Sequence, residues 1–152
     1  MYWLRLVCTL FEFWEGKEVA YEGYLLQVGN YKIPHSYISA NSYKAYLNSQ
    51  DLDSYRDGNG VLHRNALSHA PNKIELNTKN MLSNTEFAKL MSNIRNNYTN
   101  NLERKASVKA YIPELDSYVT QDMYLADLQP EIYSATAKKI QYKEIRLAFI
   151  GY

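Results

Sequence analysis

The chain has 152 residues, with 17 lysines and arginines against 16 aspartates and glutamates, and a formal net charge of +1. This length suits one domain with a sizeable core. The charges are spread without blocks, so the sequence has neither the basic stripe of a nucleic-acid binder nor the basic amphipathic helix of a membrane-surface protein. Its single cysteine, Cys8, excludes an internal disulfide framework and a multi-cysteine zinc site.

The first 19 residues differ in character from the rest. Their apolar run, residues 2–13, contains Arg5 and Glu12, and is too short and too charged to span a membrane. It also lacks the uninterrupted apolar core and the cleavage signal of a secretory signal peptide. We interpret residues 1–19 as an N-terminal extension, either a packing arm or the product of a misassigned start, because residues 15–19 can be encoded by a purine-rich stretch before a valine start codon. A native N-terminus at Met1 would contradict the second reading. Residues 20–152 are predicted to form a single domain.

Short strands with turn residues between them are predicted for the first half of that domain. Alternating or β-rich segments predict strands at residues 23–28, 31–33, 37–47, 61–67 and 73–78. Gly29-Asn30 marks a turn, and Pro34 ends the second strand. The segment 37–47 has no strongly apolar face, which favours an exposed or subunit-facing strand.

A single amphipathic helix is predicted within LSNTEFAKLMSNIRNNYTN, residues 82–100. Ser83 is a suitable N-cap, and Glu86 three residues later completes a capping box. One apolar face follows the helical spacing, and it predicts that the helix covers a sheet: Phe87, Leu90, Met91, Ile94 and Tyr98.

Three further strands are predicted at residues 106–112, 118–128 and 143–152, and in the last of them Ile145, Leu147 and Phe149 share the inward face. The order of five strands, one helix and three strands predicts an α+β fold. It would consist mostly of antiparallel β-sheet, as a split sheet or a barrel, with the helix packed across it. There are too few crossover helices for a parallel sheet.

The stretch SYRDGNGVLHRNALSH, residues 54–69, is the most motif-like part of the chain. A calcium loop starting at Asp53 would place Arg64 where a bidentate glutamate is required. The two glycines lack the Gly-Lys-Ser/Thr ending of a phosphate loop. His63 and His69 are too few ligands for zinc. No nucleophile elbow, Cys/His pair or paired-carboxylate signature is present, and so we predict no catalytic residue, no metal and no cofactor.

Asp57-Gly58-Asn59-Gly60 does predict a tight reversal, because glycine and asparagine tolerate a positive φ. The flanking residues 52–56 and 61–64 would then form a polar hairpin arm that reaches a neighbouring subunit. The 15 tyrosines add a mild argument for an assembling protein, since a tyrosine suits protein–protein contacts. The predicted interface residues of the arm are Asp53, Tyr55, Arg56, Asp57, Asn59, His63 and Arg64.

The segments AYEGYLLQVGNYKIP, SYKAYLNSQDLDSYRDGNGVLHRNAL and NKIELNTKNMLSNTEFAKLMSNI resemble an uncharacterised family of small tail structural proteins from phages and prophages of Gram-positive bacteria. The closing segment KKIQYKEIRLAFIGY resembles the end of that family. The resemblance covers about residues 20–152 and leaves out the N-terminal extension. Its order of elements is also similar to that of tail-tube and hub folds.

The resemblance implies a virion structural protein of the distal tail, baseplate or tube, made in the host cytoplasm and located in the phage tail. Its expected partners are further copies of itself in a ring and other tail proteins, with no nucleic acid and no membrane span. It implies no enzymatic activity. The alternative is a monomeric tail-tip module that binds a host receptor or glycan through exposed tyrosine and tryptophan.

Overall fold

The computed structural model describes residues 20–152, and the N-terminal extension of residues 1–19 lies outside the described residues. A seven-stranded sheet with the strand order β2-β1-β8-β9-β12-β6-β3 forms the body, and each pair of neighbouring strands is antiparallel. Its strands are β1 (Leu26–Val28), β2 (Tyr31–Lys32), β3 (Lys44–Tyr46), β6 (Lys73–Asn77), β8 (Lys105–Ile112), β9 (Ser117–Leu125) and β12 (Arg146–Gly151).

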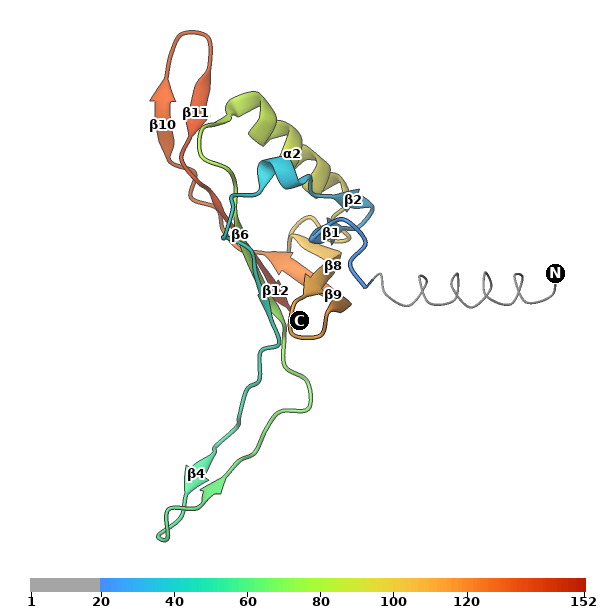
Figure 1. Cartoon of the computed structure of the whole chain (residues 1–152), viewed down its shortest axis with the longest axis vertical. Coiled ribbons are helices and arrows are strands. Elements are labelled where there is room, and N and C mark those ends of the chain that lie inside the picture. Colours follow the sequence, from blue (N-terminus) through green and yellow to red (C-terminus); the bar gives the residue numbers. More distant parts are fainter. Residues whose placement is uncertain (1–19) are drawn as a thin grey trace, which may run out of the picture.

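Two hairpin extensions leave this body at opposite ends (Figure 1). At one end, β10 (Ile132–Ala135), β11 (Ile140–Tyr142) and β7 (Leu82–Ser83) form a small three-stranded sheet beside the start of the helix. At the other end, β4 (Tyr55–Arg56) and β5 (Leu62–His63) form a two-stranded ribbon that projects far from the sheet. A 3-10 turn, η1 (His35–Tyr37), completes the elements before β3.

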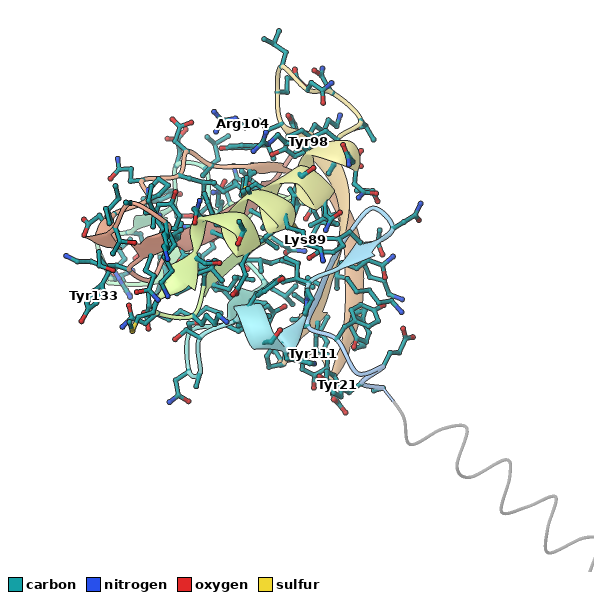
Figure 2. All side chains as sticks on the ribbon, turned by 90° about the horizontal axis from the view of Figure 1, so that it is seen from above. Tyr21, Lys89, Tyr98, Arg104, Tyr111 and Tyr133 are labelled. Atoms are coloured by element: carbon teal, nitrogen blue, oxygen red, sulfur yellow. The ribbon has the colours of Figure 1, made fainter. Side chains whose placement is uncertain are left out.

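The helix α2 (Asn84–Asn96) covers one face of the large sheet (Figure 2). It starts where the sequence predicts, because the Ser83 side chain accepts a hydrogen bond from the backbone amide of Glu86. Leu90, Met91 and Ile94 are buried against the sheet, and the partly buried Phe87 and Tyr98 pack against the same core. The apolar stripe of the helix therefore does face the core.

The sheet contributes its own side of the core, because buried and exposed side chains alternate along its strands. Every second residue of β8 is buried, from Ala106 to Ile112, and β6 buries Ile74 and Leu76. In the last strand Leu147 and Phe149 face the same core, and Ile145 just before it is also buried. This confirms the predicted inward face of the closing segment.

The large sheet is open, with β2 and β3 as its two edges. The α+β class and the mostly antiparallel sheet are thus as predicted, whereas the barrel alternative is not realised, because the strands at the two edges do not pair with each other.

Several predicted strands are shorter in the structure, among them the strand predicted from residue 23, which starts at Leu26. Residues 37–47 are predicted as one strand, but only Lys44–Tyr46 pairs with β6. A 3-10 turn takes the start of the segment, and Asn41 has a φ of 62°. The Ser42 hydroxyl then donates to the carbonyl of Ser39, so local side-chain bonding replaces the ladder. In the segment 61–67 only Leu62–His63 is a strand, and 118–128 ends at Leu125.

The β10–β11 hairpin was not predicted at all. Its reversal carries no glycine or Asn-Gly pair; instead the Thr136 hydroxyl accepts from the backbone amides of Lys138 and Lys139. Such a threonine turn is a weaker sequence signal than a glycine turn.

Candidate functional site: the projecting arm

The ribbon of residues 50–67, which we call the arm, is the region where the predicted interface residues meet. Backbone hydrogen bonds cross it from the amide of Leu67 to the carbonyl of Gln50 at the base, and from the amide of Asp57 to the carbonyl of Val61 at the tip. The isolated bridge between Asp51 and Ala66 lies near the base. The predicted hairpin is therefore present, and its ladder extends towards the body beyond residues 52–64.

The tip is organised by the side chain of Asp57. Its Oδ1 accepts hydrogen bonds from the backbone amides of Asn59 at 2.9 Å and Val61 at 3.0 Å. Its Oδ2 lies 2.9 Å from Nε2 of His63. The histidine contact and then these amides hold the pKa of Asp57 below its usual range. Gly60, with a φ of 82°, supplies the left-handed residue of the turn.

Two further contacts fix the tip from either face. The rings of Tyr55 and His63 stack, with centroids 4.9 Å apart and planes 17° from parallel. On the other side of the ribbon, the Arg56 guanidinium donates to the carbonyl of Gly60 at 2.9 Å. The tip thus holds a defined shape although its side chains lie in solvent.

Arg64 contacts Asp51, which lies outside the set of predicted interface residues. Its guanidinium donates two parallel hydrogen bonds to the Asp51 carboxylate, at 2.7 and 2.9 Å. This arginine lowers the pKa of Asp51. Because the side chains of Arg64 and Asp51 are 53% and 28% exposed, the pair adds only modestly to stability. Asp53 lies at a bend with a φ of 54° and forms no ion pair with any of residues 20–152.

The arm is less polar than its sequence suggests. No residue of the arm is buried. Five large apolar side chains are exposed on it, by 43% to 61%: Leu52, Tyr55, Val61, Leu62 and Leu67. The predicted interface residues are charged, polar or aromatic and include none of the aliphatic ones, although Val61-Leu62 directly after the turn was a visible signal.

Several of the tyrosines lie on a second surface, apart from the arm. On the face of the sheet away from α2, the Lys109 ammonium lies 5.0 Å from the ring centroid of Tyr118 and 5.7 Å from that of Tyr24. Lys105 lies 4.6 Å from the ring of Tyr152 on the same face. These cation–π contacts cover the tyrosine rings without a second protein layer.

Within residues 20–152, no cluster of three or more histidine, cysteine, aspartate or glutamate side chains could hold a metal ion. In particular, His63 contacts Asp57, whereas His69 contacts the backbone carbonyl of Tyr152 in the body. The helix of this part of the chain is also too short and too polar to cross a membrane.

The fold and the arm define a class: an α+β protein with an open antiparallel sheet, one covering helix and a projecting two-stranded arm. Residues 19–152 match a family of unknown function, DUF6711, and the chain belongs to that family. No curated protein and no solved structure matches the chain.

Proposed function

We propose that the protein is a structural component of a phage or prophage tail, in the distal tail, baseplate or tube, and that it assembles with itself and with other tail proteins through the arm. Its role is architectural and involves no catalysis. The arm is the observation that carries the proposal, and the resemblance of residues 20–152 to small tail proteins supports it.

An isolated two-stranded hairpin is only marginally stable in water, because it has no second layer on which to bury its apolar side chains. The arm nevertheless combines a fixed tip with five exposed large apolar residues. Apolar surface displayed on a preorganised element is the usual property of a protein–protein contact.

The test replaces residues 51–66 by a short Gly-Ser turn, which leaves every buried core residue in place. We expect the wild-type protein to form multi-subunit species in light scattering coupled to size exclusion, and the variant to be a monomer with the same thermal midpoint. A wild-type protein that stays monomeric at high concentration, and that also fails to bind other tail proteins, would refute the proposal.

The location in the virion has a separate test. Particles purified from a host strain that carries the gene should contain the protein in their tail fraction by mass spectrometry, and antibodies should label the tails in electron micrographs. Its absence from purified particles would contradict a virion role, even if the protein forms oligomers.

A second candidate function is a monomeric module at the tail tip that binds a host receptor or glycan. It is favoured by exposed aromatic side chains at opposite ends of the molecule, Tyr55 on the arm and Tyr133 on β10, which are 61% and 55% exposed. Binding of the monomer to a glycan array, lost on changing both tyrosines to serine, would favour this function over assembly.

A further inference from the structure

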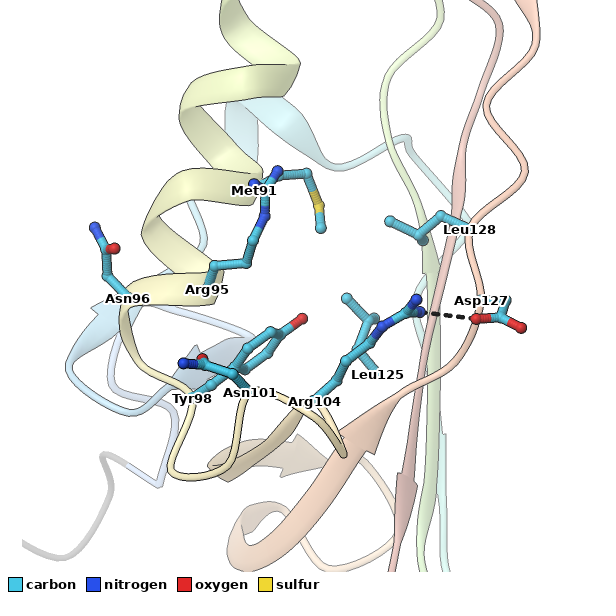
Figure 3. A pocket seen from close by; sticks show the side chains of 9 residues that line it. All are labelled: Met91, Arg95, Asn96, Tyr98, Asn101, Arg104, Leu125, Asp127 and Leu128. Atoms are coloured by element: carbon cyan, nitrogen blue, oxygen red, sulfur yellow. Dashed lines mark hydrogen bonds and ion pairs between the residues drawn. The ribbon is translucent and has the colours of Figure 1, made fainter.

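An open groove of about 740 Å³ lies at the C-terminal end of α2 (Figure 3). The helix and the loop after it form one wall, and the segment that follows β9 forms the other. Met91, Leu125 and Leu128 contribute apolar atoms to its lining. This volume falls within the range of roughly 300–1,000 Å³ that is common for binding pockets.

Two arginines give this groove a positive charge. Arg104, in a left-handed conformation with a φ of 55°, ion-pairs at 2.8 Å with Asp127, whose side chain is 90% exposed at the rim. Arg95 comes from the last turn of α2 and has no ion-pair partner among residues 20–152. Two arginines against one aspartate leave the groove basic, with apolar atoms below them.

The Tyr98 hydroxyl points into the groove between the two walls (Figure 3). Partial burial raises the pKa of Tyr98, so the phenol stays protonated at neutral pH and can donate a hydrogen bond. The groove therefore combines cationic and neutral donors with an apolar lining, which suits a segment that carries both carboxylates and aliphatic side chains.

A second groove, of about 680 Å³, lacks this excess of positive charge. Asp127 lines both grooves and forms its ion pair with Arg104, which leaves two acidic residues, Glu131 and Glu144, against two basic ones, Lys143 and Arg146, in the second groove. An acidic segment would therefore prefer the groove of Arg95 and Arg104. The two grooves thus differ in the partner that they can accept.

The arm tip has the properties that the first groove requires. Between residues 53 and 62 it carries two aspartates, Asp53 and Asp57, against one arginine, Arg56, and it exposes Val61 and Leu62. The arm points away from the body of its own chain (Figure 1), so it cannot occupy its own groove. A second copy can supply the groove instead.

We propose that the arm tip of one copy seats in the Arg95–Arg104 groove of the next copy, with the Asp53 carboxylate towards the arginines and Val61 and Leu62 on the apolar lining. This inference rests on the proposed function and names the acceptor surface for the arm. Donor and acceptor are different surfaces, so the contact is heterologous. Repeated from copy to copy, it generates a ring or a helical filament.

Cross-linking between two separately purified proteins tests the pairing. Both carry Cys8→Ala; one also carries Asn59→Cys at the arm tip, and the other Asn101→Cys, which lines the groove. After mixing, a short bismaleimide should join the two chains. Asn80→Cys, which is exposed in the second groove, is the matched control and should give at least tenfold less product.

Charge reversal provides an independent measurement. Arg95→Glu should weaken assembly at least tenfold in light scattering, whereas Lys89→Glu, a charge reversal at another exposed position on the same helix, should leave it unchanged. Asp53→Lys combined with Arg95→Glu should restore assembly. Helix content by circular dichroism shows whether each variant is folded.

The outcomes separate the two proposals. If the oligomer requires the arm but Asn59→Cys couples equally to both grooves or to neither, the groove assignment is wrong and the structural role stands. If Arg95→Glu and Lys89→Glu weaken assembly alike, the assignment is also wrong. If the wild-type chain forms no assembly with itself, the inferred pairing is refuted whatever other tail proteins the arm binds.

Discussion

The body and the arm of this protein both carry large apolar side chains, which are buried in the body and exposed on the arm. In the body, β8 buries every second side chain, and Leu147 and Phe149 of β12 are at most 1% exposed. In the arm, Leu52, Val61 and Leu62 lie in solvent by 46% to 55%. The difference is a second layer: α2 covers the sheet, whereas no other element among residues 20–152 covers the ribbon.

This comparison shows that a large apolar side chain stabilises the fold only where another layer excludes water from it. The arm is held in shape by backbone hydrogen bonds, one bidentate ion pair and the Asp57 turn instead. Its apolar residues are consequently free to stabilise a contact with another molecule. Stability and assembly should therefore respond to mutations in different parts of the chain.

The largest effect should come from the core. Phe149→Ala removes the largest fully buried side chain among residues 20–152 and leaves a cavity between α2 and the sheet. We expect a loss of about 3–5 kcal/mol in the free energy of unfolding, measured by urea denaturation. Leu102→Ala, at a side chain that is 95% exposed, is the control and should change it by less than about 0.5 kcal/mol. Equal losses would remove the distinction between buried and exposed positions.

A smaller loss should follow from the only buried polar side chain among the described residues, Thr78. Its hydroxyl accepts a hydrogen bond from the backbone amide of Ile145 at 3.0 Å. Thr78→Val keeps the shape but leaves that buried amide without a partner, and should cost about 1–3 kcal/mol. The same change at the exposed Thr120 on β9 should be nearly neutral. A neutral Thr78→Val would show that this hydrogen bond adds nothing.

The arm should give the reverse result. The double change Val61→Ser and Leu62→Ser should alter the free energy of unfolding by less than about 0.5 kcal/mol, because neither side chain is buried. It should nevertheless abolish the multi-subunit species in light scattering. The matched control changes two exposed leucines of the body, Leu102 and Leu115, to serine and should leave assembly intact. If the Val61→Ser, Leu62→Ser variant lost folding stability but still assembled, the contrast between a stabilising body and an assembling arm would be wrong.

The smallest effect concerns pH at the arm tip. The pKa of Asp57 is lowered in the folded tip, so the contribution of its carboxylate is complete above the ordinary aspartate pKa of about 3.9 and is lost as the pH falls through the lower folded value. The NMR amide shifts of Asn59 and Val61 should therefore titrate together below pH 3.9. The amide of Ala126, bonded to the carbonyl of Ala148 in the body, should not follow them. A common midpoint above pH 3.9 would reverse the inferred sign.

Much of this architecture was determined by the sequence alone. The helix could be predicted because its signals are local: Ser83 caps it and five apolar residues share one face. The alternation in residues 106–112 and 145–149 fixed which side of two strands is buried. The reversal at residues 57–60 and the hairpin around it followed from the need for a left-handed residue at Gly60.

Only the tertiary structure decided the strand order, the groove and the side-chain pairs, because these features depend on what lies opposite each residue. Chain order could not say that β12 would pair between β9 and β6 and leave the sheet open, or that α2 would end at a groove containing two arginines. The pairing of Arg64 with Asp51, 13 residues away, depended on the register of the ribbon. The exposure of Val61 and Leu62 was also decided by the tertiary structure. Their residue types favour burial, but no layer of the described chain reaches the arm.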